Sequence, residues 1–311
     1  MNKLTSFLDH LTIGTPQTHG NLKVYPLHRQ NGHERQYRTL DEAMQEKVID
    51  VTEVSEGGSV PSLKVHNSGK LPVLLIIGEE LIGAKQNRVL NTSLLVPAES
   101  DLIIPVSCVE QGRWAYSSRK FESSSTSSSH FALRMAQTEQ VTRSLKSRAT
   151  YAADQGEIWD EVGRKVSSHR ATSPTHALKD VYDQSEKQLK EYLEAFTPPE
   201  DAEGILVEIG DQVVGADVFD HADTLRTLWP KLVRSYALDA LERRGQKTEP
   251  AKTKDTQQFL VSVREAEDET FDSVGLGQDV RLSSKAITGS GLLWEDQLIH
   301  ASLFNTKAQP A

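Results

Sequence analysis

The spacing of apolar residues changes twice along the chain, and this limits the folds that it can adopt. Up to about residue 110 the chain has short stretches rich in β-branched residues, such as "PVLLIIG" and "DLIIPVSCVEQ", which predict strands. Over residues 131–197 apolar residues recur three and four positions apart, which predicts amphipathic helices. Strand-like stretches return after residue 200. Sheets at both ends with helices between them predict an α+β fold.

Local signals add detail to this pattern. Thr39 followed by Glu42 predicts a helix that begins with a capping box. The stretch 117–129 holds eight Ser and one Thr, a composition that favours a mobile surface loop. Residues 245–256 are expected to form a polar connection, and "QFLVSVREAE" after it is interpreted as a strand.

Two segments, 73–88 and 205–220, resemble one another. When Gly78 is aligned with Gly210, the stretches "LIGA" and "VVGA" that follow also align. Each segment is interpreted as a strand, a tight hairpin turn and a second strand, with glycine supplying the positive φ of the turn. The repeat predicts two related β-rich units joined by a helical section, with boundaries at 15–125, 131–197 and 200–305.

The two copies differ directly after their shared alanine. The first continues "KQNR", whereas the second continues "DVFD" and leads into a helix. Asp220 suits the N-cap of that helix and Asp223 its first turn. Because only the first copy keeps a polar, amide-rich run, we expect a ligand site there. The alternative is an exposed hairpin whose charges neutralise one another and protect a strand edge.

The candidate site residues come from the first copy and from "CVEQGRW" downstream. In a strand, Lys85 and Asn87 would share one face, and Gln86 and Arg88 the other. Arginine binds phosphate, amides bind sugar hydroxyls or base edges, and indole stacks on a ring. The predicted ligand-binding residues are Gln86, Asn87, Arg88, Asn91, Gln111, Arg113 and Trp114. The predicted catalytic residues are Glu79, Glu80 or Glu110 as the general base, with Lys85 stabilising negative charge.

Composition excludes several functions. The chain carries a net charge of -9, and residues 1–150 hold 17 Lys and Arg against 15 Asp and Glu, so no basic stripe suited to nucleic acid is expected. No apolar run reaches the roughly 20 residues of a membrane span, and the N-terminus lacks a signal-peptide core. Cys108 is the single cysteine, which excludes an internal disulfide. A cytoplasmic protein without a membrane partner is expected.

Metal and cofactor signals are weak. Asp217, Asp220, His221 and Asp223 could bind a cation, although helix capping explains them better. "GLGQDV" lacks the third glycine of a dinucleotide fingerprint and is interpreted as a turn. No cofactor is predicted, and a requirement for a divalent metal is left open.

The run "GEELIGAKQNRVLNTSLLVPAESDLIIPVSCVEQGRW" resembles a bacterial family named for its association with ADP-ribosylglycohydrolases and rhodanese-like phosphatases. "IGDQVVGADVFD" and "GLLWEDQLIHASLF" fit the same family, so the resemblance spans about residues 15–305. It implies the company of ADP-ribose and phosphate chemistry, and it implies no established reaction and no catalytic residues.

Two functions are therefore open. The leading hypothesis is that the chain binds a small phosphorylated ligand related to ADP-ribose or NAD, and whether it also processes that ligand is left open. The alternative is a non-catalytic interaction or sensor module whose partner is an ADP-ribosylglycohydrolase-type enzyme or a phosphatase. The sequence leaves open whether the protein is an enzyme.

Overall fold

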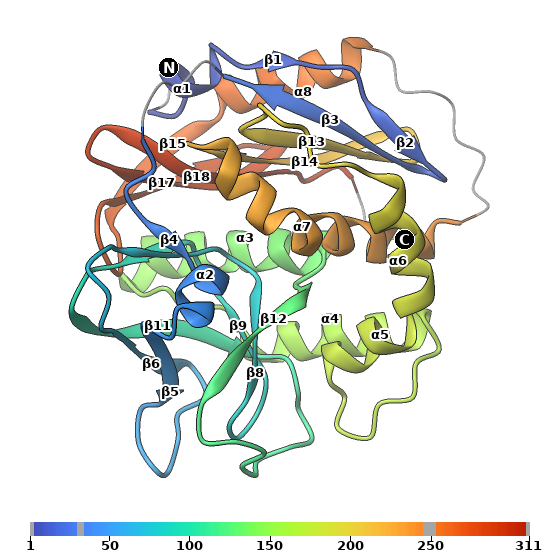
Figure 1. Ribbon diagram of the computed structural model, residues 1–311. Coiled ribbons are helices and arrows are strands. Elements are labelled where there is room, and N and C mark those ends of the chain that lie inside the picture. Colours follow the sequence, from blue (N-terminus) through green and yellow to red (C-terminus); the bar gives the residue numbers. More distant parts are fainter. Residues whose placement is uncertain (1–2, 30–33, 245–252, 309–311) are drawn as a thin grey trace. The chain divides into compact units, whose positions relative to one another are not determined.

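The chain folds into two compact units in the computed structural model, which describes residues 3–29, 34–244 and 253–308 (Figure 1). Unit 1 joins Met1–Arg35, Gln188–Ser273 and Gly277–Ala311, and unit 2 joins Gln36–Lys187 and Val274–Leu276. Strands and helices are both abundant, which confirms the predicted α+β class. The predicted division into 15–125, 131–197 and 200–305 stays a prediction.

Unit 1 is built on one antiparallel sheet, which has nine strands among the described residues. The strand before residue 30 belongs to this sheet, because β3 pairs with β13 along six residue pairs. The order is β1-β3-β13-β14-β18-β17-β16-β15, with β2 beside β3. The bounds are β1 Thr12–Ile13, β2 Gln17–His19, β3 Leu22–His28, β13 Gly204–Ile209, β14 Gln212–Phe219, β15 Glu267–Asp272, β16 Gln278–Ser283, β17 Ile287–Trp294 and β18 Gln297–Asn305.

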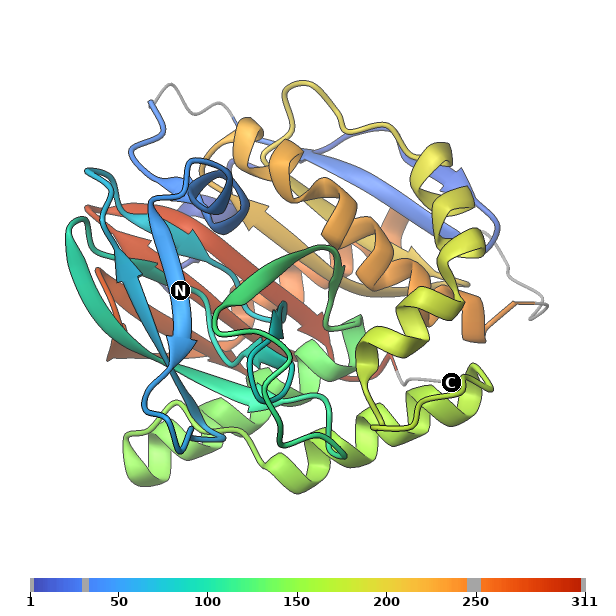
Figure 2. The ribbon, with the colours of Figure 1, turned by 60° about the horizontal axis from the view of Figure 1, so that its bottom comes forward.

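Helices cover both faces of this sheet. Ala216 and Val218 of β14 share a buried apolar cluster with Val263 of α8 (Thr253–Glu265), and α1 (Thr5–Leu8) joins the same cluster. Alternate residues of a strand face opposite ways. Asp217 accordingly accepts a hydrogen bond from Tyr236 of α7 (Ala222–Glu242), at 2.8 Å. Figure 2 shows α7, in orange, lying along the sheet.

The start of α7 corrects one prediction. Its N-cap is His221, whose Nδ1 accepts a hydrogen bond from the backbone N–H of Asp223, at 3.1 Å. Asp220 therefore does not cap the helix, whereas Asp223 is the first-turn acid as predicted. The helix runs without a break through Pro230.

Unit 2 contains a closed barrel of six strands in the part of the chain that the structure describes, in the order β11-β6-β5-β12-β8-β9. Its apolar interior includes Val51, Val65, Leu81 and Val106. A three-stranded sheet, β10-β7-β4, accompanies the barrel. The bounds are β4 Arg38–Thr39, β5 Ile49–Glu53, β6 Ser62–Asn67, β7 Val73–Leu75, β8 Glu79–Gly83, β9 Arg88–Leu90, β10 Leu94–Val96, β11 Ser100–Cys108 and β12 Phe121–Ser128.

The helices of unit 2 follow the sequence pattern closely. The predicted capping box is confirmed at α2, where the Thr39 N–H donates to Glu42 at 2.8 Å and the Thr39 hydroxyl accepts from the Glu42 N–H. The predicted helical region is confirmed as a series of four helices, the last of which begins at the end of unit 2. The bounds are α2 Leu40–Gln45, α3 Phe131–Arg148, α4 Gln155–Ser168, α5 Leu178–Gln184 and α6 Glu186–Ala195.

Two segments have a different secondary structure from the one predicted. Most of the Ser-rich stretch 117–129 is not a loop, because residues 121–128 form β12 between β5 and β8. "QFLVSVREAE" is helical in α8, where Phe259, Leu260 and Val263 are buried at helical spacing. Of the predicted polar connection 245–256, residues 245–252 lie outside the described residues.

The two similar segments share a turn but not a pairing scheme. Gly78 and Gly210 both adopt positive φ, at 82° and 70°. In the second segment β13 pairs directly with β14. In the first, β7 pairs with β10 and β4, whereas β8 belongs to the barrel, so the prediction of a hairpin there was wrong. An internal repeat stays a prediction that rests on the sequence and on the shared turn.

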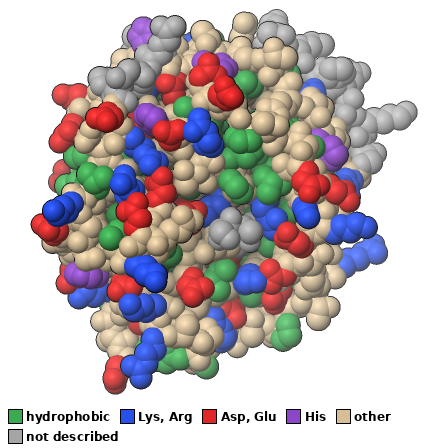
Figure 3. Space-filling view, viewed as in Figure 1, with side chains coloured by type: hydrophobic (Ala, Val, Ile, Leu, Met, Phe, Trp, Pro, Cys, Tyr) green, Lys and Arg blue, Asp and Glu red, His purple; other side chains and the backbone are tan. Residues whose placement is uncertain are grey.

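Two further expectations concern a basic stripe for nucleic acid and a membrane span, neither of which the sequence predicts. Figure 3 shows Lys and Arg side chains interspersed with Asp and Glu on the face drawn. Among the described residues, no helix combines the length and the apolar character needed to cross a membrane.

Candidate functional site

Three loops meet at one end of the barrel in unit 2. They are residues 54–61 between β5 and β6, 84–87 between β8 and β9, and 109–120 between β11 and β12. Lys85 Nζ donates to the Gly57 carbonyl at 2.8 Å, and the Lys85 carbonyl accepts from the Ala115 N–H at 3.3 Å. Cross-loop bonds of this kind hold the predicted "KQNR" and "GRW" segments together. We call this region the loop-end site.

The "KQN" residues form a turn rather than a strand, so the predicted alternation of their faces was wrong. Ala84 adopts a left-handed φ of 39°, and β9 begins only at Arg88. The Gln86 amide instead bonds to the third loop and to Arg88 of β9. Its Nε2 donates to the Glu110 carbonyl at 3.0 Å, and its Oε1 accepts from Arg88 Nη1 at 3.1 Å.

Glu110 and Arg113 form the structural centre of the loops. Arg113 donates to both carboxylate oxygens of Glu110, at 2.8 and 2.6 Å, and to the Ala84 carbonyl at 2.7 Å. The Asn87 N–H and the Thr175 hydroxyl also donate to this carboxylate, each at 3.0 Å. Burial alone would raise the pKa of Glu110, but these hydrogen bonds outweigh it and lower the pKa. A carboxylate so fully bonded is a poor general base.

Arg88 is buried beside this network but is much less satisfied. Its side chain is fully buried, and burial lowers the pKa of the guanidinium while the nearby Cys108 and Glu53 raise it. Nη1 donates to Gln86, whereas Nε and Nη2 have no hydrogen-bond partner in the described part of the chain. The Trp114 ring lies over the guanidinium, with 5.7 Å between its centroid and Cζ.

Aromatic rings give the site its exposed surface. Trp114 is 48% exposed and Tyr116 is 51% exposed, which is unusual for large rings. Lys85 Nζ lies 5.2 Å from the Trp114 centroid and 5.0 Å from the Tyr116 centroid, within the range of cation–π attraction. The site therefore offers a cation flanked by two accessible π faces.

A hollow of about 900 Å³ opens beside the Tyr116 ring. Glu53, at the end of β5, lies in its wall and is only 8% exposed. Its Oε1 accepts from the Lys85 N–H at 3.3 Å, whereas its Oε2 has no hydrogen-bond partner among the described residues. The hollow is lined by Thr52, Glu53, Ser55, Glu56, Tyr116, Ser117, Ser118 and Arg119.

The sequence had not singled out Glu53. The available signal was a carboxylate that ends a strand just before the glycine pair "GG" of residues 57 and 58. A glycine-rich loop lets the backbone and neighbouring side chains approach closely. That signal indicates a site only when the last residues of β5 and β8 are known to lie at the same end of the barrel.

Other candidates lie elsewhere. Glu79 and Glu80 are buried at the start of β8, about 13 and about 10 Å along the strand from its loop end. Glu79 accepts a hydrogen bond from the Ile76 N–H at 2.8 Å. Asn91, past the far end of β9, accepts from Ser107 and donates to the Tyr151 carbonyl. Gln111 is exposed in the third loop. The loops thus bring together Lys85, Gln86, Asn87, Arg88, Glu110, Gln111, Arg113 and Trp114, but not these two glutamates or Asn91.

A comparison with models of protein families identifies the family of the chain. The family model described as ARG and Rhodanese-Phosphatase-superfamily-associated Protein domain matches residues 10–304. The chain belongs to this family. Membership confirms the resemblance drawn from the sequence and covers the residues of both units. Comparisons with curated proteins and with solved structures give no match.

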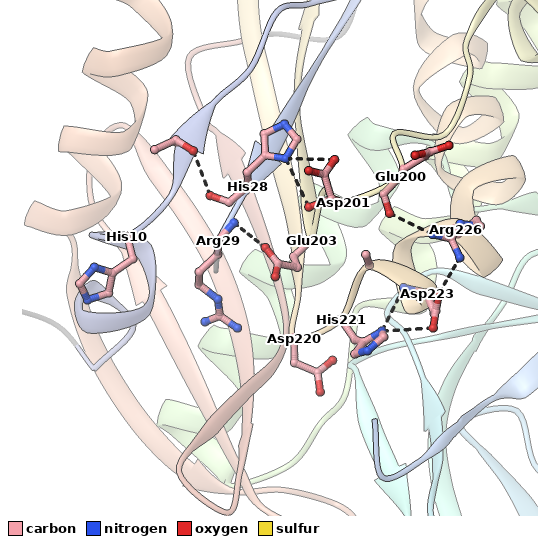
Figure 4. Close-up of a pocket in the computed structure, with 12 residues that line it drawn as sticks. His10, His28, Arg29, Glu200, Asp201, Glu203, Asp220, His221, Asp223 and Arg226 are labelled. Carbon is pink, nitrogen blue, oxygen red and sulfur yellow. Dashed lines mark hydrogen bonds and ion pairs between the residues drawn. The ribbon is translucent and has the colours of Figure 1, made fainter. Parts of the chain in front are cut away.

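In this family member, unit 1 has a second hollow, of about 1080 Å³ (Figure 4). Its charged side chains interact largely with one another. Arg226 pairs with Asp223 at 2.5 Å, and His28 Nδ1 lies 3.8 Å from an Asp201 carboxylate oxygen. Among the described residues, no group of three or more His, Cys, Asp and Glu side chains is arranged to hold a metal ion. The lining residues are His10, Thr12, His28, Arg29, Glu200, Asp201, Glu203, Asp220, His221, Ala222, Asp223 and Arg226.

Proposed function

We propose that the chain binds a small phosphorylated ligand related to ADP-ribose or NAD at the loop-end site. The observation that carries the proposal is the buried guanidinium of Arg88, in which two nitrogens, Nε and Nη2, lack an acceptor among the described residues. Unsatisfied buried donors are costly, and those on a cation cost most. A phosphate oxygen is the acceptor that guanidinium groups bind most effectively.

The residues around Arg88 suit the rest of such a ligand. Lys85 supplies a second, partly exposed cation for a diphosphate. Trp114 and Tyr116 provide faces on which an adenine ring could stack, an interaction of about 1 to 3 kcal/mol per base. Access to Arg88 requires the Trp114 ring to move aside, since it covers the guanidinium. The family description, with its rhodanese-phosphatase association, agrees with phosphate chemistry.

A second candidate function is binding without turnover, as in a sensor or interaction module that partners an ADP-ribosylglycohydrolase-type enzyme or a phosphatase. The observation that favours it is the state of the predicted bases. Glu110 is saturated with hydrogen bonds, and its pKa is lowered. Glu79 and Glu80 lie toward the opposite end of β8. A general base needs a free lone pair within hydrogen-bonding reach of the proton that it removes from the substrate.

Titration calorimetry with ADP-ribose, its phosphorylated forms and NAD, followed by mass spectrometry of the mixtures, tests both candidates. Binding with product formation supports an enzyme, and binding without product supports the sensor. If none of these compounds binds, the proposal is contradicted.

An Arg88→Met variant locates the binding. We expect it to weaken binding by about 1.5 to 3 kcal/mol, the worth of a hydrogen bond to a charged group. Its free energy of unfolding should be unchanged or higher, because an apolar side chain of similar length avoids burying a charge. The control is Arg143→Met, on the exposed side of α3 in the same unit, which should leave affinity unchanged. Equal affinities of the two variants would place the ligand elsewhere.

A further inference from the structure

Glu53 and Arg88 are two buried groups of opposite charge that do not hydrogen bond to each other. Burial lowers the pKa of Arg88 and the negative charge of Glu53 opposes that shift, so the two groups interact electrostatically. Yet Glu53 Oε2 and Arg88 Nε and Nη2 are each buried without a hydrogen-bond partner in the described residues. Direct pairing would satisfy both groups, and its absence indicates that something belongs between or beside them.

The space next to Glu53 is kept open by a glycine. A Cβ placed on Gly58, whose φ is +75°, would lie 3.0 Å from Lys85 Cδ, 3.2 Å from Glu53 Oε2 and 3.3 Å from Trp114 Cζ2. A side chain at this position would therefore crowd the carboxylate, the lysine stem and the indole together. The three groups that could contact a ligand thus converge on one point.

The chemistry of these groups defines what can satisfy them. A carboxylate only accepts hydrogen bonds, and a guanidinium only donates them. A group that satisfies both must donate to Glu53 and accept from Arg88, as a hydroxyl does. A fully ionised phosphate would be repelled by Glu53, so phosphate alone does not fit both.

We infer that Glu53 recognises a sugar hydroxyl of the ligand and so determines its class as a phosphorylated sugar or ribonucleotide. This inference rests on the function proposed above and deepens it. The phosphate lies on the side of Lys85 and Arg88, a hydroxyl donates to Glu53 Oε2, and the aromatic rings flank the remainder. Glu53 is thus a specificity-determining residue that discriminates against ligands that lack the hydroxyl.

The test compares ADP-ribose with an analogue in which the hydroxyls of the terminal ribose are replaced by hydrogen. Affinities of both compounds are measured by calorimetry for the wild-type chain, for Glu53→Gln and for Glu122→Gln. Glu122 is an exposed carboxylate of β12 outside the lining of the hollow, and its variant makes the same change in charge. We expect the wild-type chain and Glu122→Gln to prefer ADP-ribose at least tenfold, and Glu53→Gln to lose that preference.

Each other outcome has a definite meaning. If the wild-type chain binds both compounds equally, a water satisfies Glu53 and the inference is overturned, whereas the proposed function stands. If Glu53→Gln keeps the preference, another residue recognises the hydroxyl, and the inference is again overturned. If the wild-type chain binds neither compound, the inference is overturned, and the proposed function then depends on the titrations with NAD and the phosphorylated forms of ADP-ribose. The wild-type comparison needs no variant, so it holds even if Glu53→Gln does not fold.

Discussion

At the scale of single residues, the loop-end site contains two kinds of buried charge. Some are fully hydrogen-bonded and stabilise the fold, and others keep atoms that can bind a ligand. Glu110 receives hydrogen bonds from Arg113, Asn87 and Thr175, which fasten the second and third loops. Arg88, the first residue of β9, keeps two nitrogens without an acceptor among the described residues. Buried charged side chains of one site therefore have different roles, which depend on how completely each is hydrogen-bonded.

Glu110 makes the stability of the protein depend on pH. Its pKa is lowered in the folded state from the usual value of 4.5. A lowered carboxyl pKa contributes stability that is present above the unfolded-state pKa and is lost as the pH falls through the folded-state pKa. We expect Glu110→Gln to cost roughly 1 to 3 kcal/mol of unfolding free energy at pH 7, because Arg113 keeps its donors but loses its charged acceptor.

Denaturant melts of the wild-type chain and Glu110→Gln between pH 7 and pH 3 measure this effect. The difference between the two chains should shrink as the pH falls below about 4.5. The exposed Glu122 provides the control, since Glu122→Gln should follow the wild-type curve throughout. A difference that stays constant with pH would show that the Glu110 charge contributes nothing to the fold.

The sequence predicted the composition of the site better than its geometry. "AKQNR" and "CVEQGRW" meet because Arg88 and Cys108 are paired residues of β9 and β11, a register that one sequence does not reveal. Glu79 stands near Lys85 in the sequence but lies far from the loops, since a strand advances about 3.3 Å per residue. Glu53 was missed because its neighbours in space come from other strands.

At the scale of secondary-structure elements, β12 shows where composition misleads. Serine has little intrinsic preference for strands, so the run 121–128 was expected to be a loop. The barrel overrides that preference, because β5 and β8 flank β12 and supply backbone partners. Hydroxyls add local support, as in the Ser128 hydrogen bond to the Gly78 carbonyl at 2.8 Å. Tertiary pairing of this kind is invisible to local sequence patterns.

The first two residues of β12 allow a matched test of its structural role. Phe121 is 3% exposed within the barrel's apolar cluster, and its neighbour Glu122 faces solvent. Phe121→Ala should lower the unfolding free energy by about 3 to 5 kcal/mol through the lost burial and the cavity left behind. Glu122→Ala should change it by less than about 0.5 kcal/mol. Denaturant melts that give both variants the same small change would indicate that β12 does not close the barrel in solution.

At the scale of the whole molecule, the order of elements was predictable but the grouping of segments was not. Strands, helices and strands follow one another as the hydrophobic period predicts. However, β3, near the N-terminus, pairs with β13, which lies beyond the helices, and so Met1–Arg35 belongs to the same compact unit as the C-terminal strands. Pairing between such distant segments leaves no trace in the spacing of apolar residues. The similarity of the turns at Gly78 and Gly210 also led to the wrong prediction that β8 pairs with the strand before it.

Because each unit has its own hollow, the location of the ligand is a question about the whole chain. We expect ADP-ribose to slow amide hydrogen exchange in the three loops of unit 2, residues 54–61, 84–87 and 109–120, because a ligand that orders a loop reduces its local opening. Residues 199–203 and 220–226, which border the hollow of unit 1, should exchange at the same rate with and without ligand. Exchange measured by mass spectrometry on the wild-type chain and on Arg88→Met separates specific from general effects, since the variant should lose the protection in all three loops. Protection confined to 199–203 and 220–226 would transfer the site to unit 1, where His221 and Arg29 would then be the residues to vary.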